Sequence, residues 1–259
     1  MRGAEPHLLF PRAKVTKEDV EQAIRFESDL RKRYDVLPLE HEPWFAVLEG
    51  KSKVIVSAPH ATAQTRENQW KPADAGTGAL AVMLNKLGCE TVIYTTCRSP
   101  SDPNFYDDND YKRELRTLIE KSHPRLLIDL HASHWYRPYD VDFGTLSGKS
   151  LDPHKTWLSK FSEVLRTSGL QNFSQDYFAA AEHETVTRFA HNLGVPAVQM
   201  EINETWLDFF AHTANGNSQQ ADMDDNAKNQ PNINDDSAHR FSQLLEGLLR
   251  ITDWIDSSR

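Results

Sequence analysis

Two histidines stand at equivalent places in this sequence, each just after a short apolar run. His60 follows Val54–Ala58, and His131 follows Leu126–Leu130. Runs of this kind are typical of strands that are buried on both faces of a sheet. Ligands of open α/β sheets bind outside the carboxyl ends of the strands, so two imidazoles placed there can converge on one point. Imidazole is the commonest metal ligand in proteins, and the pair favours a metal site over two unrelated surface histidines.

Carboxylates near these histidines could complete such a site. A catalytic zinc usually takes three protein ligands and one water, and Glu67, in the loop after His60, is our candidate for the third ligand. Glu201 lies near the end of the apolar run Ala197–Ile202, where a carboxylate must be paired, bound to metal or catalytic. It is our candidate for the general base. Asp129, two residues before His131, could accept a hydrogen bond from that imidazole.

Other polar residues offer weaker signals. Arg98 and Arg137 could bind a substrate carboxylate through paired hydrogen bonds. Cys97 could serve as a thiolate nucleophile, although a lone cysteine after a strand is more often a core residue. The sequence contains neither a phosphate-binding loop motif nor a Gly-x-Ser-x-Gly nucleophile elbow.

The elements that must position these residues can be read from hydrophobic periodicity and from turn signals. We expect helices over 17–33, Gly78–Leu87, Asp110–Ser122, 153–168, Thr185–Asn192 and Ser237–Ile255. We expect strands over Trp44–Leu48, Lys53–Ser57, Thr91–Thr96, Leu126–Leu130, Val141–Thr145 and Pro196–Ile202. This alternation predicts an α/β fold with a mostly parallel sheet. A polar segment over 211–236 interrupts the pattern, and we expect one domain, 1–259, that contains it as an insertion.

Composition excludes several classes of function. The 259 residues carry a net charge of −9, with 29 Lys and Arg against 38 Asp and Glu, which argues against a nucleic-acid partner. No apolar run approaches the ~20 residues that span a bilayer, so we expect no membrane partner. Cys89 and Cys97 are the only cysteines, and residues 1–6 lack the apolar core of a signal peptide. The cytoplasm is therefore the expected compartment. The sequence does not indicate an oligomeric state.

Five short segments, in this order and rough spacing, resemble the N-formylglutamate amidohydrolase family. They are Ser57-Ala58-Pro59-His60-Ala61, Lys71-x-x-Asp74-x-x-Thr77-Gly78-x-Leu80-Ala81, Asp129-Leu130-His131, Asp140-Val141-Asp142-Phe143-Gly144-Thr145 and Gln199-Met200-Glu201-Ile202-Asn203. The resemblance covers about residues 53–205. It leaves the N-terminal helix and the polar insertion outside.

The resemblance implies a relative of zinc carboxypeptidases and aspartoacylase. The implied fold is a three-layer α/β/α sandwich around a mixed, mostly parallel sheet, and the implied cofactor is one zinc ion. His60 and His131 match the two histidine ligands of the family, and Glu201 matches its catalytic glutamate. The Asn-Arg pair of the wider group is missing, and Arg98 with Asn104 is the nearest equivalent. Glu67 stands as our substitute for the third ligand.

These observations lead to one principal hypothesis and three rivals. The principal hypothesis is a zinc-dependent amidohydrolase that cleaves the C–N bond of a small N-acylated, N-formyl-type amino acid. A metallocarboxypeptidase acting on peptides is the first rival. A non-catalytic metal- or ligand-binding protein of the same fold is the second, and a metal-independent hydrolase that uses Cys97 is the third.

Overall fold

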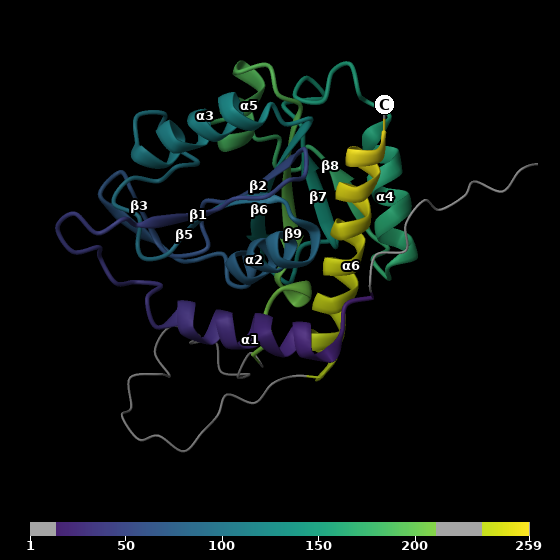
Figure 1. Cartoon of the computed structure of the whole chain (residues 1–259), viewed down its shortest axis with the longest axis horizontal. Coiled ribbons are helices and arrows are strands. Elements are labelled where there is room, and N and C mark those ends of the chain that lie inside the picture. The colour runs from purple at the N-terminus through teal and green to yellow at the C-terminus, as the bar shows by residue number, and fades with distance from the viewer. Residues whose placement is uncertain (1–13, 211–234, 259) are drawn as a thin grey trace, which may run out of the picture.

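The computed structural model describes residues 14–210 and 235–258, and its centre is a seven-stranded mixed sheet (Figure 1). The strand order is β1-β5-β2-β6-β9-β7-β8. The strands are β1 (Phe45–Leu48), β2 (Val54–Ala58), β5 (Thr91–Thr95), β6 (Leu126–Ser133), β7 (Val141–Gly144), β8 (Phe173–Gln175) and β9 (Ala197–Asn203). The four central strands β5, β2, β6 and β9 are parallel, while β1 and the β7–β8 pair run in the opposite direction. The mixed, mostly parallel sheet predicted from the sequence is confirmed.

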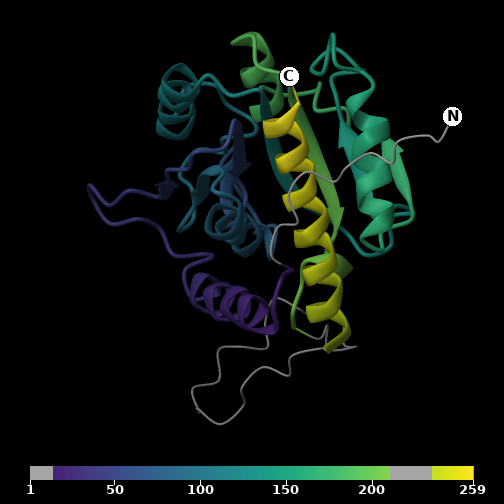
Figure 2. The same cartoon turned by 45° about the vertical axis from the view of Figure 1, so that its right-hand side comes forward.

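Helices cover both faces of this sheet. They are α1 (Lys17–Arg31), α2 (Thr77–Gly88), α3 (Asp110–Ser122), α4 (Trp157–Thr167), α5 (Val186–Asn192) and α6 (Asp235–Ser257). One apolar core joins α1, α2, α4 and α6 to the sheet, and a second core joins α3 and α5 to its other face. The three-layer sandwich is therefore present, with α6 packed between α2 and α4 (Figure 2).

The expected helices and strands are all found, with ends shifted by a few residues. Thr16 caps α1 through a reciprocal capping box with Asp19, so this helix begins at Lys17 as its sequence indicates. The strand β6 extends three residues beyond the expected end at Leu130 and so contains His131. Most of the polar insertion, 211–234, lies outside the described residues, and its last two residues, Asp235 and Asp236, begin α6.

A small hairpin was not predicted. β3 (Gln64–Arg66) pairs with β4 (Gln69–Lys71), and the two residues between them, Glu67 and Asn68, both have positive φ. Two such residues in succession are the signature of a tight two-residue hairpin turn. The strands are too short to give a periodic signal in the sequence.

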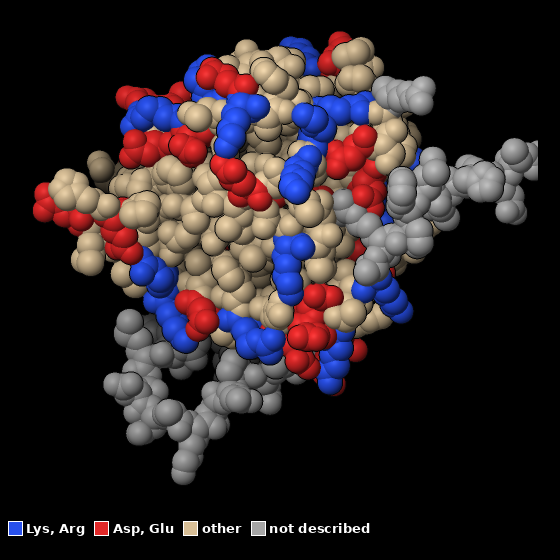
Figure 3. Space-filling model, in the orientation of Figure 1, with Lys and Arg blue, Asp and Glu red and all other residues tan. Residues whose placement is uncertain are grey.

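The charged groups are mixed over the face shown in Figure 3, with basic and acidic side chains next to one another. Exposed ion pairs among the described residues include Arg113 with Asp108 and Lys121 with Glu49. In the described part of that face, the basic side chains form no continuous strip (Figure 3). Among the described residues, no helix is both long enough and apolar enough to cross a membrane.

Candidate active site

The candidate site lies at the carboxyl ends of three adjacent parallel strands. His60 follows β2 by two residues, His131 is near the end of β6, and Glu201 is on β9. His131 and Glu201 are paired in register between β6 and β9. Paired residues of neighbouring strands point to the same face of a sheet, so both side chains project from one face at this edge.

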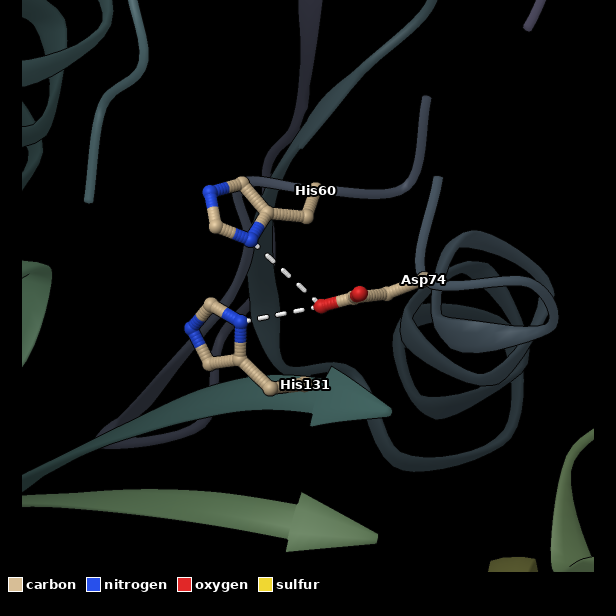
Figure 4. Close-up of side chains that lie close together, drawn as sticks. All are labelled: His60, Asp74 and His131. Carbon is tan, nitrogen blue, oxygen red and sulfur yellow. Dashed lines mark hydrogen bonds and ion pairs between the residues drawn. The ribbon is translucent and has the colours of Figure 1, made fainter. Parts of the chain in front are cut away.

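Asp74 joins the two histidines. Its Oδ2 lies 3.0 Å from Nδ1 of His131 and 3.5 Å from Nδ1 of His60 (Figure 4). One ligand atom from each of these three residues lies within 4.8 Å of the others, and the two imidazole rings stand at 75° to each other. Two imidazole nitrogens and a carboxylate oxygen that face one point are a donor set suited to zinc.

A second carboxylate contacts the other ring nitrogen, Nε2, of each imidazole. Nε2 of His60 is 2.8 Å from Oδ1 of Asp102, and Nε2 of His131 is 3.3 Å from Oδ2 of Asp129. Both aspartates are completely buried. Because each Nε2 faces its own carboxylate, each Nδ1 remains directed toward Asp74. This is the arrangement by which outer carboxylates orient histidine ligands in metal sites.

The carboxylates also set the charge state of the imidazoles. Burial opposes the imidazolium form of His60, but Asp102 and Asp74 outweigh it and raise the pKa of His60 to about 9. Burial likewise opposes the charged form of His131, yet Asp129, Asp74 and Glu201 hold its pKa well above the usual value. Burial favours the neutral form of Asp74, and the two imidazoles overcome that and lower its pKa. The three residues thus form a tightly paired cluster of charges.

Glu201 is set up to exchange a proton near neutral pH. Burial raises its pKa to about 7, although the nearby charges of His131 and His60 act in the opposite direction. Its Oε1 accepts a hydrogen bond of 2.9 Å from Nε2 of Gln199. A carboxylate with this pKa, beside a potential metal site, is suited to general base chemistry.

Asp74 and Asp102 were not predicted as site residues. Asp74 lies in the turn before α2, where its backbone N–H donates to the carbonyl of His60 at 2.7 Å and its carbonyl accepts from the Thr77 hydroxyl. Its one sequence signal was its place in the second of the five segments, for which we had assigned no role. Asp102 lies in the polar loop between β5 and α3, where no periodicity distinguishes it from its neighbours.

Glu67 is placed differently from our expectation. It occupies the tip of the β3–β4 hairpin with a φ of 53°, it is exposed, and its backbone N–H donates to the Tyr106 hydroxyl. The two-residue turn directs the tip into solvent, and Asp74 takes the place beside the histidines that we had expected Glu67 to take.

The expected substrate-binding residues have other partners. Arg98 donates to Asp35 at 3.0 Å. The side chain of Asn104 accepts from the backbone of Val186, while its own N–H donates to Oδ1 of Asp102, the oxygen that also faces His60. Asn104 therefore holds in place Asp102, the carboxylate that contacts His60.

Arg137 lies in the loop after β6. Its guanidinium sits 5.0–5.4 Å from the ring centres of Tyr136, Tyr177 and Phe178 and donates to the Tyr177 hydroxyl.

Cys97 is buried, and burial raises the pKa of its thiol, which is the opposite of what an activated nucleophile requires.

Glu27 connects α1 to the turn that bears Asp74. It is buried, and Oε1 accepts from the backbone N–H of Gly76 at 2.9 Å and from the hydroxyl of Tyr34. Gly76 has a φ of 84°, and a Cβ there would lie 2.4 Å from the carbonyl oxygen of Leu207, so the turn has little freedom to move. Glu27 thereby fixes the turn that bears Asp74.

We expect Glu27→Ala to loosen this turn. The change should weaken metal binding by about tenfold, which is the lower end of the range of losses in affinity caused by removing residues that orient metal ligands. It should also lower the free energy of unfolding by about 1–3 kcal/mol, because buried polar groups lose their partner. Glu27→Gln keeps an oxygen for Gly76 and should restore most of the metal affinity. Glu21→Ala, at an exposed position of the same helix, is the control, and equal effects of the two alanine variants would contradict the proposed bracing.

Comparison with solved structures supports the fold. The chain aligns with N-formylglutamate amidohydrolase from Ralstonia eutropha JMP134 with a TM-score of 0.53 and 13% identity, over 82% of this chain and 97% of that one. It also aligns with a metallo-carboxypeptidase from Burkholderia cenocepacia, with a TM-score of 0.46 and 12% identity, over 93% and 70% of the two chains. No protein-family model matches the sequence, and no curated protein matches it. The first alignment confirms the fold that the sequence resemblance implied.

Proposed function

We propose that this protein is a zinc-dependent amidohydrolase that cleaves the C–N bond of a small N-acylated amino acid of the N-formyl type. His60, Asp74 and His131 would bind one zinc ion, and Glu201 would act as general base. The observation that carries the proposal is the convergence of two Nδ1 atoms and one carboxylate oxygen within 4.8 Å, beside a half-buried glutamate on the next strand. The solved structure of the same fold from Ralstonia eutropha is itself an N-formylglutamate amidohydrolase.

The donor set fits zinc chemically. Imidazole nitrogen and carboxylate oxygen are ordinary zinc ligands, and Asp102 and Asp129 already hold both imidazoles with Nδ1 facing inward. When bound, zinc would polarise the acyl carbonyl and lower the pKa of a coordinated water toward ~7. With only three protein ligands, a position remains for water or substrate, as catalytic rather than structural sites require.

The protein's own groups would then manage the proton and the substrate. Glu201, as a carboxylate, would accept the proton of the attacking water and pass it to the leaving amine. Its pKa of about 7 allows both steps near neutral pH. Arg137, fixed among three aromatic rings in the loop after β6, is our candidate for binding the substrate carboxylate, with Arg98 second.

Metal analysis combined with an amidase assay tests the proposal. The purified protein, after chelation and reloading, should bind one zinc ion per chain and release amine from N-formyl-L-glutamate. Loss of turnover on chelation and its recovery with zinc would support the assignment. Failure to bind zinc would contradict the metal site.

Two rival functions remain open to direct test. A metallocarboxypeptidase would cleave short peptides faster than formyl amino acids, so both substrate classes belong in the assay. A non-catalytic binding protein would take up zinc and hydrolyse neither class. Cys97→Ser should leave activity unchanged, since the thiol is buried and its pKa is raised.

Metal affinity should rise with pH. The pKa of His60 is raised to about 9 and that of His131 also lies above its usual value, so without zinc both imidazoles are protonated at neutral pH. Zinc must displace a proton from each Nδ1, so the affinity should increase by up to about tenfold per pH unit for each proton released, levelling off near pH 9. Calorimetric titration in buffers of different ionisation enthalpy counts the released protons. An affinity that does not change between pH 6 and 8 would contradict this charge assignment.

We place the protein in a reducing compartment such as the cytoplasm. Cys89 and Cys97 are both free thiols, which supports that proposal.

A further inference from the structure

Three buried polar atoms near Glu201 have no hydrogen-bond partner. They are Oγ of Ser133, Oη of Tyr139 and Oε1 of Gln199, and each is shielded from solvent within the described part of the chain. Buried polar groups in folded proteins nearly always have partners, because leaving one unpaired is costly. Three such atoms in one neighbourhood therefore indicate a place where a bound molecule supplies the missing partners.

The strand register brings two of these residues to the face that bears the site. Ser133 follows His131 by two residues on β6, and Gln199 precedes Glu201 by two on β9. Side chains two residues apart share a face, and β6 and β9 are in register over this stretch. Ser133 and Gln199 therefore flank the His131–Glu201 pair on the same face of the sheet.

Tyr139 is fixed in the loop that joins β6 to β7. Its neighbour Asp140 accepts from the backbone of Asn203 at 2.9 Å and, through its carboxylate, from the indole N–H of Trp206. The ring of Tyr139 is 3% exposed and packs edge-to-face on Tyr177. Burial and the charge of Glu201 raise the pKa of Tyr139 to about 12, while the Ser133 hydroxyl acts in the opposite direction. Tyr139 is thus a protonated hydrogen-bond donor at neutral pH, and both the Ser133 hydroxyl and the charge of Glu201 act on it.

A neighbouring carboxylate shows what a purely structural group looks like here. Asp142 is paired with Glu201 in register and is completely buried. Its oxygens accept from the Ser174 hydroxyl at 2.7 Å and from the backbone N–H groups of Tyr177 and Phe178. The fold therefore satisfies this neighbouring carboxylate fully, whereas the three atoms around Glu201 are left without a partner.

We infer that Ser133, Tyr139 and Gln199 form a subsite for the amide group of the substrate. The hydroxyl of Tyr139, with that of Ser133, would donate to the acyl oxygen, while Oε1 of Gln199 would accept from the amide N–H. A secondary amide carries both an oxygen acceptor and an N–H donor, so it offers the complementary group to each of these atoms. Gln199 is held in this orientation because its Nε2 donates to Glu201. The inference rests on the proposed function for the reaction, although the subsite can be tested by binding alone.

Tyr139→Phe is the principal test, with zinc-loaded protein and N-formyl-L-glutamate as substrate. Removing one donor to the acyl oxygen should lower kcat by about 100-fold, because charge develops on that oxygen in the transition state. KM should change far less, and zinc content should stay at one ion per chain. Tyr94→Phe, which removes the hydroxyl of a buried tyrosine packed against Phe26, should leave kcat within about twofold. If the Tyr139 hydroxyl served only the fold, Tyr139→Phe would instead lower the amount of folded, zinc-loaded protein. The protein that did fold would then keep the wild-type kcat and KM.

Binding measurements separate failure of the subsite from failure of the hydrolase proposal. N-formyl-L-glutamate should bind zinc-loaded Glu201→Gln protein more tightly than the double variant that also carries Tyr139→Phe. If the wild type hydrolyses nothing but this difference in binding persists, the proposed reaction is wrong and the subsite stands. If Tyr139→Phe fails to fold, Ser133→Ala decides by the same measurements. Wild-type kcat and unchanged binding in Tyr139→Phe, or in Ser133→Ala as its substitute, would overturn the inference.

Discussion

Glutamine in place of Glu201 should lower kcat by about 10²–10⁴-fold, the usual contribution of a positioned general acid–base group. The change preserves the size of the side chain and removes its ability to accept a proton. Glu201 lies beside His131 in the sheet register, and it is not one of the three residues that share the donor cluster. Zinc content should therefore remain at the wild-type level while turnover is lost.

The pH profile gives this prediction a second measurement. Burial raises the pKa of Glu201 to about 7, so the carboxylate is the charged form above that pH and the neutral acid below it. Because only the charged form accepts a proton, kcat/KM of the wild type should fall as the pH drops through this range. The residual kcat/KM of Glu201→Gln should not fall in this way as the pH drops.

Glu163→Gln is a suitable control, since this glutamate is exposed on α4 and pairs only with the nearby Lys160 among the ion pairs of the described residues. Its kcat and pH profile should match those of the wild type. If Glu201→Gln retained most of the wild-type kcat, Glu201 could not be the general base. Parallel loss of zinc and activity would instead assign Glu201 to the metal site.

The sequence predicted those parts of the site that lie on the sheet. His60, His131 and Glu201 all belong to apolar strands or follow them directly, and parallel strands bring their carboxyl ends to one edge. Burial of a short apolar run dictates where it must lie, so the ends of such runs can be located without knowing the loops. This is why the mixed sheet and the placement of these three residues at one edge could be predicted together.

The residues that the sequence did not identify are held by contacts between loops. Asp102 reaches His60 across 42 positions of sequence, from a polar loop in which several aspartates look alike. Asp74 is placed by its backbone hydrogen bond to His60 and by the bond from Gly76 to the distant Glu27. Such bonds depend on tertiary packing, and hydrophobic periodicity contains no information about them.

The choice of Glu67 as the third ligand shows the same limit of prediction from sequence, because it too depended on how the loops fold. Glu67 was chosen because it lies close to His60 in sequence, but two short strands place it at the tip of a hairpin. Asp74 lies twice as far along the chain, and its backbone N–H bonds directly to the carbonyl of His60. Chain distance and spatial distance diverge here because a tight turn reverses the chain between the two carboxylates.

Asp74→Asn and Glu67→Gln should therefore have opposite outcomes. Each replaces a carboxylate by its amide, and each changes the net charge by one unit. Asp74→Asn should weaken zinc binding by about 100-fold or more, at least as much as the loss of a residue that only orients a ligand. It should also lower the pKa of His60 and His131, because Asp74 contributes to holding both imidazoles in the charged form.

Competition with a chromophoric chelator measures the zinc affinity of both variants, and NMR titration of the imidazoles measures the pKa of each histidine. Glu67→Gln should match the wild type in both, because its side chain is exposed at the hairpin tip and only its backbone N–H bonds to Tyr106. The reverse result, with zinc lost from Glu67→Gln and kept by Asp74→Asn, would require the hairpin to fold back over the histidines when zinc binds. Because Gln64 and Lys71 already pair across that hairpin, such a movement would have to shift both strands together.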